Sequence, residues 1–337
     1  MNDNRPILGI TLGDPAGVGP EITVKALAEQ ELYEEVRPLV FGDRCVLEAA
    51  IALCGGSSKV HAAADPGTAR FQPGTIDLVD TGGLSAPPPL GMISAAAGRA
   101  GYVCLERAIE AALAGSIDAL VTAPLNKESL RAAQVPFLDH TAVLTARAAR
   151  YEPMTLFMAG PLRIFFLTRH IPFREIAGAI TLETFSTALP LCLRYLRHLG
   201  IEDPQLAVAA LNPHGGERGL FGREEMEIIA PAIDAARSRG LKVTGPVPAD
   251  AVFHQASAGL YDGILALYHD QGHIAAKTLD FYGTVSLTMG LNFLRTSVDH
   301  GTALDIAGQG RADSQGMTRA IQVGGRYALG VKARLAL

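Results

Sequence analysis

The chain has 337 residues, of which 48% are hydrophobic, 19% charged and 6% aromatic. This composition excludes a rod, a collagen-like chain or a largely disordered protein, and the length suits two domains of roughly 100 to 200 residues each. Lys and Arg total 29 against 34 Asp and Glu, giving a net charge of -5. The chain therefore lacks the positive excess of a nucleic-acid or anionic-membrane binder.

The four cysteines show neither CxxC nor metal-ligand spacing, so we expect a reducing, cytoplasmic setting. The short apolar run at the N-terminus breaks at Gly13 and Asp14, which predicts no signal peptide. The most apolar later stretch, 154–168, is interrupted by Gly160, Pro161 and Arg163 and is too short to span a bilayer. We expect neither a membrane nor a nucleic acid as partner.

Short β-type runs alternate with helical patterns, which predicts an α/β fold with a largely parallel sheet. The first part of the chain is predicted to hold strands at 7–12, 39–42, 76–80 and 118–123, with an Ala-rich helix at 95–114. Residues 154–168 predict an antiparallel hairpin turning at AGPL, and a helix over 173–199 follows. The alternation resumes with strands at 206–212, 262–270 and 282–290 and a helix at 223–239.

The segment GITLGDPAGVGPE (9–21) joins a strand to a helix through a Gly-rich turn, a setting in which backbone amides bind anions. Its spacing matches neither GxGxxG nor GxxxxGK[ST]. We therefore interpret it as a tight turn, with Pro20 and Glu21 in the first turn of the helix.

Three histidines follow predicted strands: His170 after FFLTR, His214 after AVAALNP and His269 after GILALY. Loops at the carboxyl ends of parallel strands are where α/β sheets place ligands. Three imidazoles suit a divalent cation, with zinc as the natural candidate. Their spacing lacks the regularity of HExxH, so three structural histidines are the alternative. His61, His198 and His254 have no such context and are interpreted as structural.

Three polar clusters combine Arg, Lys, His and Thr, which together suit a phosphate or a carboxylate. They are DHT at 139–141, HDQGH with Lys277 at 269–277, and RTSVDHGTALDIAG at 295–308. In the last, a glycine-containing turn is predicted just before a helix, where backbone amides can face a nucleotide. Each cluster taken alone can also be a capped helix start.

Five segments, GDPAGVGPE, TAPLNK, LNPHGGE, YHDQGHIAAK and RTSVDHGTALDIAG, resemble the 4-hydroxythreonine-4-phosphate dehydrogenases (PdxA) and their close relatives. The resemblance runs from about residue 9 to residue 308. It implies the isocitrate/isopropylmalate dehydrogenase-like fold, with two α/β domains flanking a cleft that holds the active site. It implies a first domain of about 1–139 plus 292–337, and a second of about 140–291 that carries a homodimer interface.

The resemblance also implies roles for individual residues. His170, His214 and His269 would bind the metal, with ligands shared between two subunits. His140, Thr141, Lys277 and Arg295 match substrate-binding positions, and Ser286 stands at a further one. His300, Gly301 and Asp305 would contact NAD(P)+. The metal is expected to be Zn2+, with Mg2+ and Co2+ as alternatives.

Two departures from the family pattern concern the substrate. Ala142 replaces the Glu of a His-Thr-Glu run, and Val285-Ser286-Leu287-Thr288 replaces Val-Asn-Ile-Thr. In addition, HDQGH with His273 looks closer to relatives that oxidise 4-phospho-D-threonate or 4-phospho-D-erythronate.

The function implied is metal-dependent, NAD(P)-linked oxidation with decarboxylation of a 4-phosphorylated hydroxy acid such as 4-phosphooxy-L-threonine. Lys127, Asp250 and Asp270 are candidates for proton transfer or for orienting a ligand. The alternatives are a 4-phospho-D-threonate or D-erythronate dehydrogenase, and an enzyme like terephthalate cis-dihydrodiol dehydrogenase. Outside this class, the alternatives are a metal-dependent hydrolase or lyase without nucleotide, and a noncatalytic sensor of a phosphorylated metabolite.

Overall fold

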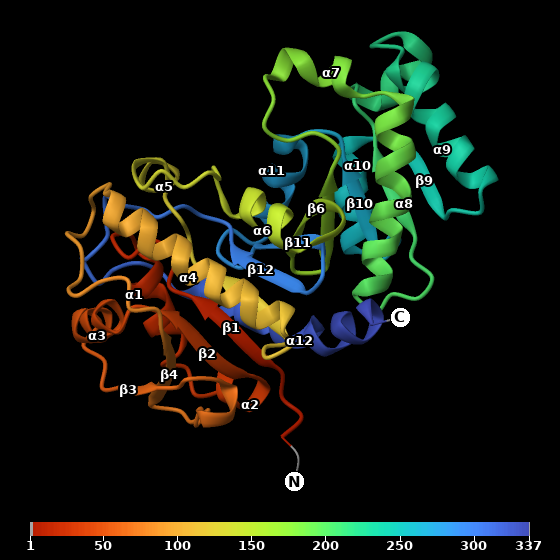
Figure 1. The fold of residues 1–337 in the computed structure, drawn as a ribbon. Coiled ribbons are helices and arrows are strands. Elements are labelled where there is room, and N and C mark those ends of the chain that lie inside the picture. The colour runs from red at the N-terminus through yellow and green to blue at the C-terminus, as the bar shows by residue number, and fades with distance from the viewer. Residues whose placement is uncertain (1–2, 337) are drawn as a thin grey trace. The chain divides into compact units, whose positions relative to one another are not determined.

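The computed structural model describes residues 3–336, and the chain divides into two compact units. The first unit is Met1–Pro153 with Val285–Leu337, and the second is the continuous segment Met154–Thr284. Figure 1 shows both as sheets flanked by helices. The predicted alternation of strands and helices is confirmed.

The first unit contains a sheet in the order β3-β4-β2-β1-β5-β12-β11. Its pairs are parallel except β11 with β12, which are antiparallel. The strands are β1 Ile7–Thr11, β2 Arg37–Gly42, β3 Lys59–Ala62, β4 Thr75–Asp80, β5 Ala119–Thr122, β11 Val285–Leu291 and β12 Leu294–Val298. The helices are α1 Gly19–Ala26, α2 Leu32–Glu35, α3 Arg44–Leu53, α4 Ala95–Leu113, α5 Lys127–Ala132, α6 His140–Ala148 and α12 Gln315–Leu335, with a 3-10 turn at Pro66–Thr68.

Helices α4 and α12 cover opposite faces of this sheet. Neighbouring residues of a strand point to opposite sides, so each strand contributes side chains to both contacts. On one face, Leu39, Phe41 and Leu120 form a buried cluster with α4. On the other face, α12 packs against β12, β5 and β1, with Gly324 lying against Leu8 and Val121. A buried sheet of this kind fixes the strand ends that carry site residues.

The second unit contains strands in the order β6-β7-β10-β8-β9. Strand β6 (Ala149–Ala159) begins within the first unit, and its residues 156–159 form the predicted antiparallel hairpin with β7 (Leu162–Phe166). Strands β7, β10 (Gly263–Ala266), β8 (Leu206–Ala209) and β9 (Val243–Val247) are parallel neighbours. The helices are α7 Ile176–Ala179, α8 Leu182–His198, α9 Ala230–Ser238, α10 Ala249–Ser257 and α11 His269–Leu279. Shorter turns lie at Phe173–Glu175, Pro213–Gly219 and Glu225–Ile229, the last of these π-helical.

Several predicted elements differ from the structure. The helix predicted over 173–199 is two helices bent by 86°, because Thr181 caps a new helix and forms a capping box with Thr184. Residues 294–298 are a strand that was not predicted, and so are residues 59–62. Residues 304–310 form turns, and the next helix begins only at Gln315, so no helix directly follows the glycine-containing turn.

The unit boundaries lie at 153/154 and 284/285, compared with the predicted 139/140 and 291/292. Two contacts account for the difference. Helix α6 packs on α4 and contributes Val143 and Leu144 to the first unit's core. Strand β11 pairs with β12 through four residues, so it too belongs to the first unit.

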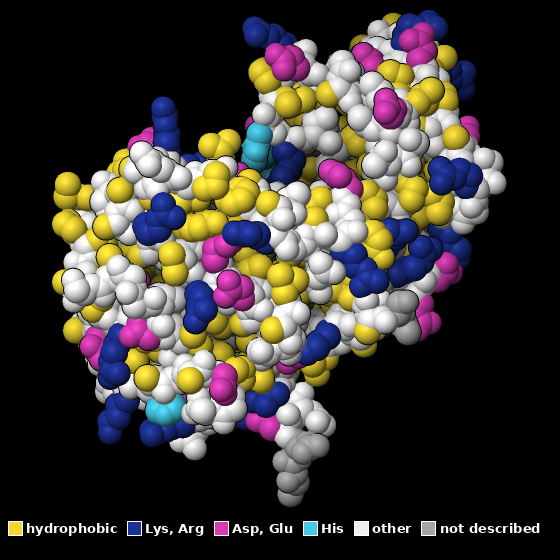
Figure 2. All heavy atoms as spheres, in the orientation of Figure 1, with side chains coloured by type: hydrophobic (Ala, Val, Ile, Leu, Met, Phe, Trp, Pro, Cys, Tyr) yellow, Lys and Arg dark blue, Asp and Glu magenta, His cyan; other side chains and the backbone are white. Residues whose placement is uncertain are grey.

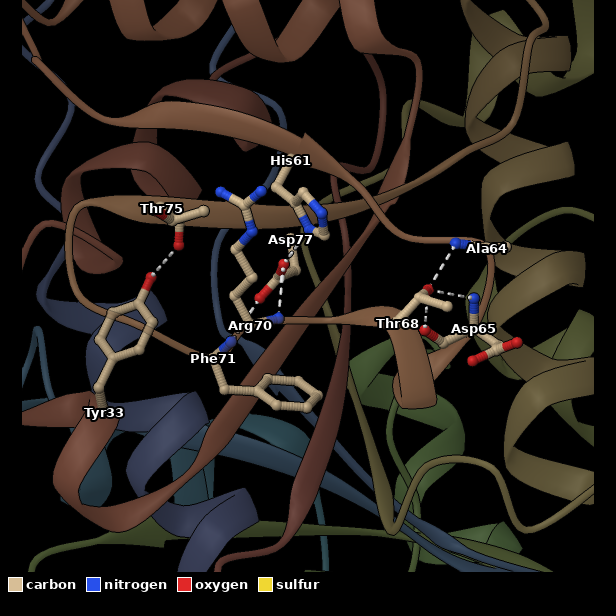
Figure 3. A network of polar contacts seen from close by, with 9 residues as sticks. All are labelled: Tyr33, His61, Ala64, Asp65, Thr68, Arg70, Phe71, Thr75 and Asp77. Atoms are coloured by element: carbon tan, nitrogen blue, oxygen red, sulfur yellow. Dashed lines mark hydrogen bonds and ion pairs between the residues drawn. The ribbon is translucent and has the colours of Figure 1, made fainter.

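His61 has the structural role that was predicted for it. Its Nδ1 lies 2.8 Å from Oδ1 of the buried Asp77, which also accepts hydrogen bonds from the amides of Arg70 and Phe71 (Figure 3). Asp77 thus ties the 64–74 loop to strand β4, and we assign it no chemistry beyond that.

Acidic and basic side chains are interspersed on the face drawn in Figure 2, which agrees with the near-balance of charges in the sequence. Within residues 3–336, no single helix is long and apolar enough to cross a membrane. The bent pair Phe173–Ala179 and Leu182–His198 meets that test only when the two helices are taken together.

Candidate active site

Three parallel neighbours in the second unit deliver the three predicted metal-ligand histidines to one edge of the sheet. Strand β10 pairs with β7 on one side and with β8 on the other, all parallel. His170, His269 and His214 follow the carboxyl ends of β7, β10 and β8 respectively. This common edge is the position at which α/β sheets bind ligands.

His170 and His269 lie close together, with ring centroids 5.8 Å apart. Two imidazoles bound to one tetrahedral zinc at Zn–N distances of about 2.0 to 2.1 Å would have centroids roughly 5 Å apart. His269 Nδ1 is 2.6 Å from Asp270 Oδ1, which leaves Nε2 for a cation and matches the carboxylate–histidine pairing of metal sites. His273, one turn on, stacks on His269 at 3.7 Å.

His214 does not join this pair within one chain: among residues 3–336, no three His, Cys, Asp or Glu side chains converge as a metal site. His214 instead lies in a loop of unusual backbone, with φ of 53° and ψ of 26°. A non-glycine residue in this left-handed region is uncommon and is found preferentially at functional sites. The imidazoles of His170 and His269 thus fit two ligand positions of a divalent cation, and further ligands are needed to complete the site.

An open groove of about 620 Å³ runs between α10 and α11 and is lined by Tyr268 and Asp270, the residues on either side of His269 in the sequence. Asp250 and Asp270 both line it, so the structure brings these two predicted acid–base residues to one place. Phe253, Tyr268 and Ile274 supply apolar walls. Lys277, on the same helix α11, holds its ammonium 4.8 Å from the Phe281 ring centroid.

In the first unit, Arg295 is a buried cation on β12, with 6% of its surface exposed. Its guanidinium donates to Thr122 Oγ1 from Nε (3.0 Å) and Nη2 (2.6 Å), and to Thr288 Oγ1 from Nη1 (3.0 Å). Within residues 3–336 no carboxylate lies within salt-bridge distance of it. Burial lowers its pKa to about 10, opposed by the charge of Asp139. A buried guanidinium held by neutral hydroxyls is suited to receive an anion.

Thr122 and Thr288 were missed as site residues in the sequence. Thr122 also donates to Ser297 Oγ (3.1 Å), which in turn donates to the Thr122 carbonyl (3.0 Å). The apolar neighbours of these residues in β5 and β11 point to buried strands, but only the register of three strands shows that the two threonines meet Arg295.

His140 and Thr141 begin helix α6, whose N-cap Asp139 accepts a hydrogen bond from the Ala142 amide at 3.0 Å. The Nε2 atom of His140 is buried without a hydrogen-bond partner. Burial and then the charge of Arg295 hold the pKa of His140 well below its usual value. His140 is therefore neutral at pH 7 and has an open polar atom near the Arg295 cation.

We expect this neutral His140 to make the protein less stable in mild acid. With the folded pKa depressed, the unfolded chain binds the proton first, so stability falls as pH drops below the unfolded value of about 6.5. His140→Gln should flatten the fall in unfolding temperature between pH 7 and pH 5, measured by calorimetry. The exposed His254→Gln is the control, and an unchanged slope in His140→Gln would contradict the assignment.

The remaining predicted residues of the first unit are spread over several elements. Lys127 begins α5 and is mostly exposed, with Nζ 3.9 Å from Asp139 Oδ2. Ser286 lies on β11 opposite Ser297 of β12. Lys127 thus lies beside Asp139, whose charge acts on Arg295, and Ser286 lies on β11, the strand that pairs with the Arg295 strand β12.

His300, Gly301 and Asp305 belong to an irregular segment that packs on the Gly-rich turn. The Val18 amide donates to the Thr302 carbonyl at 3.0 Å, and Asn126 Nδ2 donates to Thr302 Oγ1 at 3.3 Å. A side chain at Gly17 would meet Thr302 at 2.8 Å, so this close approach requires glycine. No heavy atom lies within 4 Å of the position that a Cβ at Gly301 would take.

The Gly-rich turn is held by internal hydrogen bonds. Asp14 Oδ1 accepts from the Ala16 amide at 2.9 Å, and burial raises the pKa of this carboxyl. Glu21, in the first turn of α1, accepts from Lys25 Nζ and from the Ala312 amide. These contacts fasten the turn to the C-terminal part of the first unit.

Known proteins match this chain over nearly its whole length. A sequence profile of PdxA, the pyridoxal phosphate biosynthetic protein, matches residues 34–324. A Symbiobacterium thermophilum protein provisionally named D-threonate 4-phosphate dehydrogenase is 47% identical over 327 residues, covering 97% of this chain and 98% of its own.

Solved structures agree with this assignment. 4-Hydroxythreonine-4-phosphate dehydrogenase from Klebsiella pneumoniae superimposes with a TM-score of 0.91 at 40% identity, covering 97% of this chain and 99% of its own. A terephthalate 1,2-cis-dihydrodiol dehydrogenase from Burkholderia xenovorans reaches 0.63 at 28% identity, covering 97% and 98%.

The fold is therefore the isocitrate/isopropylmalate dehydrogenase-like α/β arrangement, and the relatives' shared designation as dehydrogenases makes this chain an oxidoreductase. With a profile match over most of its length and a relative at 47% identity, the chain belongs to the PdxA family.

Proposed function

We propose that the protein is a metal-dependent, NAD(P)-linked dehydrogenase that oxidises and decarboxylates a 4-phosphorylated hydroxy acid. The observation that carries this proposal is Arg295, a buried guanidinium whose hydrogen-bond partners are all uncharged hydroxyls. A phosphate dianion would neutralise it through the bidentate geometry that guanidinium favours. Lys277 matches a second substrate-binding position of the family and would add positive charge for the same anionic substrate.

The substrate that we favour is D-threonate 4-phosphate, or its erythronate isomer, over 4-phosphooxy-L-threonine. The relative at 47% identity is provisionally named for D-threonate 4-phosphate. Ala142 adds no carboxylate to the first turn of α6, next to His140 and Thr141. A substrate ammonium would need such an acceptor, whereas the hydroxyl of a hydroxy acid does not.

His170, His214 and His269 would hold the cation in a homodimer in which two subunits share the site. Helix α11 supports an interface, because it exposes Ile274 and Leu279 along the groove between α10 and α11. When bound, the cation would act as a Lewis acid at the secondary hydroxyl, and the nicotinamide would accept the hydride.

The side chains of this chain would supply positioning and proton transfer. Asp270 orients the His269 ring through Nδ1. Asp250, which lines the groove beside α11, is our candidate to accept the hydroxyl proton. Lys127, whose ammonium lies 3.9 Å from Asp139 Oδ2, is our candidate to donate a proton to the product after CO2 is lost. His300, Gly301 and Asp305 would contact the nucleotide through the open turn beside Gly301. The four free cysteines are compatible with activity in a reducing cytoplasm.

The test is NAD(P)H formation at 340 nm with a substrate panel in metal-loaded and metal-stripped protein. The panel contains D-threonate 4-phosphate, D-erythronate 4-phosphate, 4-phosphooxy-L-threonine and a terephthalate cis-dihydrodiol. We expect metal-dependent turnover of the phosphorylated acids, with D-threonate 4-phosphate or its isomer highest. Thermal stabilisation without turnover would favour a sensor, and turnover of the dihydrodiol alone would refute the phosphate role.

Thr122→Val should raise KM for the phosphorylated substrate about tenfold, because Arg295 loses the acceptor of two of its hydrogen bonds and is no longer held in place. Thr122→Ser retains the hydroxyl and should restore KM. Steady-state kinetics of both variants check this. Equal KM values for Val and Ser would show that the hydroxyl does not position Arg295.

A further inference from the structure

Five consecutive residues, from His214 to Arg218, have left-handed backbone conformations, with φ between 41° and 76°. Two are glycines, but His214, Glu217 and Arg218 carry side chains that disfavour this region. Such a run persists only when surrounding contacts hold it. The contacts that hold it therefore also determine where the His214 ring lies.

Glu225 provides the main contacts at the start of this loop. It is 3% exposed, and its Oε1 accepts from the amides of Leu211 (2.9 Å) and Asn212 (2.7 Å). Its Oε2 accepts from Asn212 Nδ2 at 2.8 Å. One buried carboxylate thus receives three N–H donors from the two residues that lead into the Pro213–Gly219 turn.

Asn212 completes the arrangement. Its Nδ2 also donates to Glu224 Oε2 at 2.6 Å, so one amide nitrogen bridges two adjacent carboxylates. These two carboxylate acceptors fix the orientation of the Asn212 amide, because a flipped amide would point its Oδ1 at two carboxylate oxygens, which donate no hydrogen bond. The hydrogen bond from its own amide and then that from Asn212 hold the pKa of Glu224 below its usual value.

Two glycines allow the loop to close around these groups. A Cβ at Gly216 would lie 2.7 Å from Glu225 Oε2, and one at Gly222 would lie 2.4 Å from Asn212 Nδ2. Both are also in positive φ, at 76° and 137°. The loop is therefore packed directly on the Glu225 carboxylate and the Asn212 amide, with no room for side chains between them.

A π-helical turn presents Glu225 to the loop. The Ala230 amide bonds to the Glu225 carbonyl five residues back, and Pro231 follows. Pro231 has no N–H, and its ring would clash with the carbonyl of Glu227 in an unbroken α-helix. The wider turn avoids that clash, and turns of this kind are frequent at functional sites.

We propose that Glu225 is a positioning residue for His214: it holds the left-handed loop in the one conformation that presents the imidazole to the cation. This inference rests on the proposed function, in which His214 is a metal ligand. Glu225 itself need not contact the metal or the substrate.

The experiment is a titration of the metal-free, full-length protein with Co2+, followed by visible absorption. Glu225→Gln keeps one oxygen for the two backbone amides but sets an NH2 group against Asn212 Nδ2. We expect Co2+ affinity to fall about 10- to 100-fold, the range for groups that orient a ligand. Glu227→Gln is the matched control, since it removes a carboxylate of the same turn that pairs only with the exposed Arg223.

A double-mutant cycle with His214→Ala separates positioning from general damage. The His214→Ala variant releases its metal on dialysis but keeps the neighbouring His170 and His269, so its weaker Co2+ affinity is measured by extending the titration to high Co2+ concentration. If Glu225 acts through His214, Glu225→Gln causes no further loss of Co2+ affinity in the His214→Ala background. The proposal is overturned if Glu225→Gln lowers Co2+ affinity equally in the wild-type and His214→Ala backgrounds. It is also overturned if Glu225→Gln alone binds Co2+ as tightly as Glu227→Gln does. Wild-type Co2+ affinity in His214→Ala itself would instead overturn the metal assignment, and this inference with it.

Asn212→Ala serves if Glu225→Gln does not fold. It removes the bridging amide but leaves the backbone hydrogen bonds to Glu225 Oε1. We expect a smaller loss of Co2+ affinity, again absent in the His214→Ala background. Unchanged affinity in Asn212→Ala would count against the loop as the determinant of the His214 position.

Discussion

His214→Ala is expected to abolish metal retention and turnover while leaving the fold largely intact. The ring follows strand β8 at the same sheet edge as His170 and His269, and it contacts Phe221 only loosely, at 6.4 Å between centroids. Loss of Lewis-acid assistance is worth several kcal/mol, which corresponds to roughly a thousandfold or more in rate. Metal content after dialysis and NAD(P)H formation measure the two effects.

His214→Asn is the second variant for this test, since Asn tolerates the left-handed backbone better than Ala does. If both variants lose metal and turnover, the imidazole and not the loop backbone is responsible. As the control, His198→Gln at the C-terminal end of α8 should retain both. Full turnover by metal-stripped His214→Ala would refute the metal role.

Arg295→Ala should chiefly raise KM for the phosphorylated substrate, by about 30-fold or more. Removing one partner of a buried, hydrogen-bonded charge pair costs about 2 kcal/mol at least, and 1.4 kcal/mol corresponds to a tenfold change. Arg295→Lys keeps the charge but cannot bond Thr122 and Thr288 in the same fork, so it should recover only part of the loss.

Arg147→Ala is the matched control for this experiment. Its guanidinium lies at the surface of the same unit and pairs with Glu106, so KM should not change. Steady-state kinetics with D-threonate 4-phosphate distinguish the outcomes. A KM for Arg295→Ala equal to that of Arg147→Ala would show that the buried guanidinium does not bind the anion.

The placement of the three histidines at one sheet edge was predictable because strand ends are visible in sequence. Buried parallel strands give apolar runs, and the residues just after them lie at one edge of the sheet, so the sequence alone allows His170, His214 and His269 to be grouped. The sequence pattern does not give the order of the strands in the sheet. Only the order β7-β10-β8 shows that His269 follows the central strand of the three.

The less predictable features depend on contacts between segments distant in sequence. Strand β12 was not predicted, because Arg295, Thr296 and Ser297 are buried polar residues, whereas strand recognition relies on apolar ones. Glu225 was not noted because a carboxylate in a helical stretch ordinarily faces solvent. Its role appears only once the left-handed loop is seen to pack on it.

The order of strands in the first unit has a consequence for biosynthesis. Strand β12, with Arg295, sits between β5 and β11, yet both β11 and β12 lie beyond residue 284. While the ribosome makes the intervening segment, β5 keeps an unpaired edge, a state that invites aggregation. The continuous segment 154–284 can complete its own sheet first. We therefore expect nascent chains truncated before residue 294 to need chaperone protection, even though they already contain all three histidines of the proposed metal site.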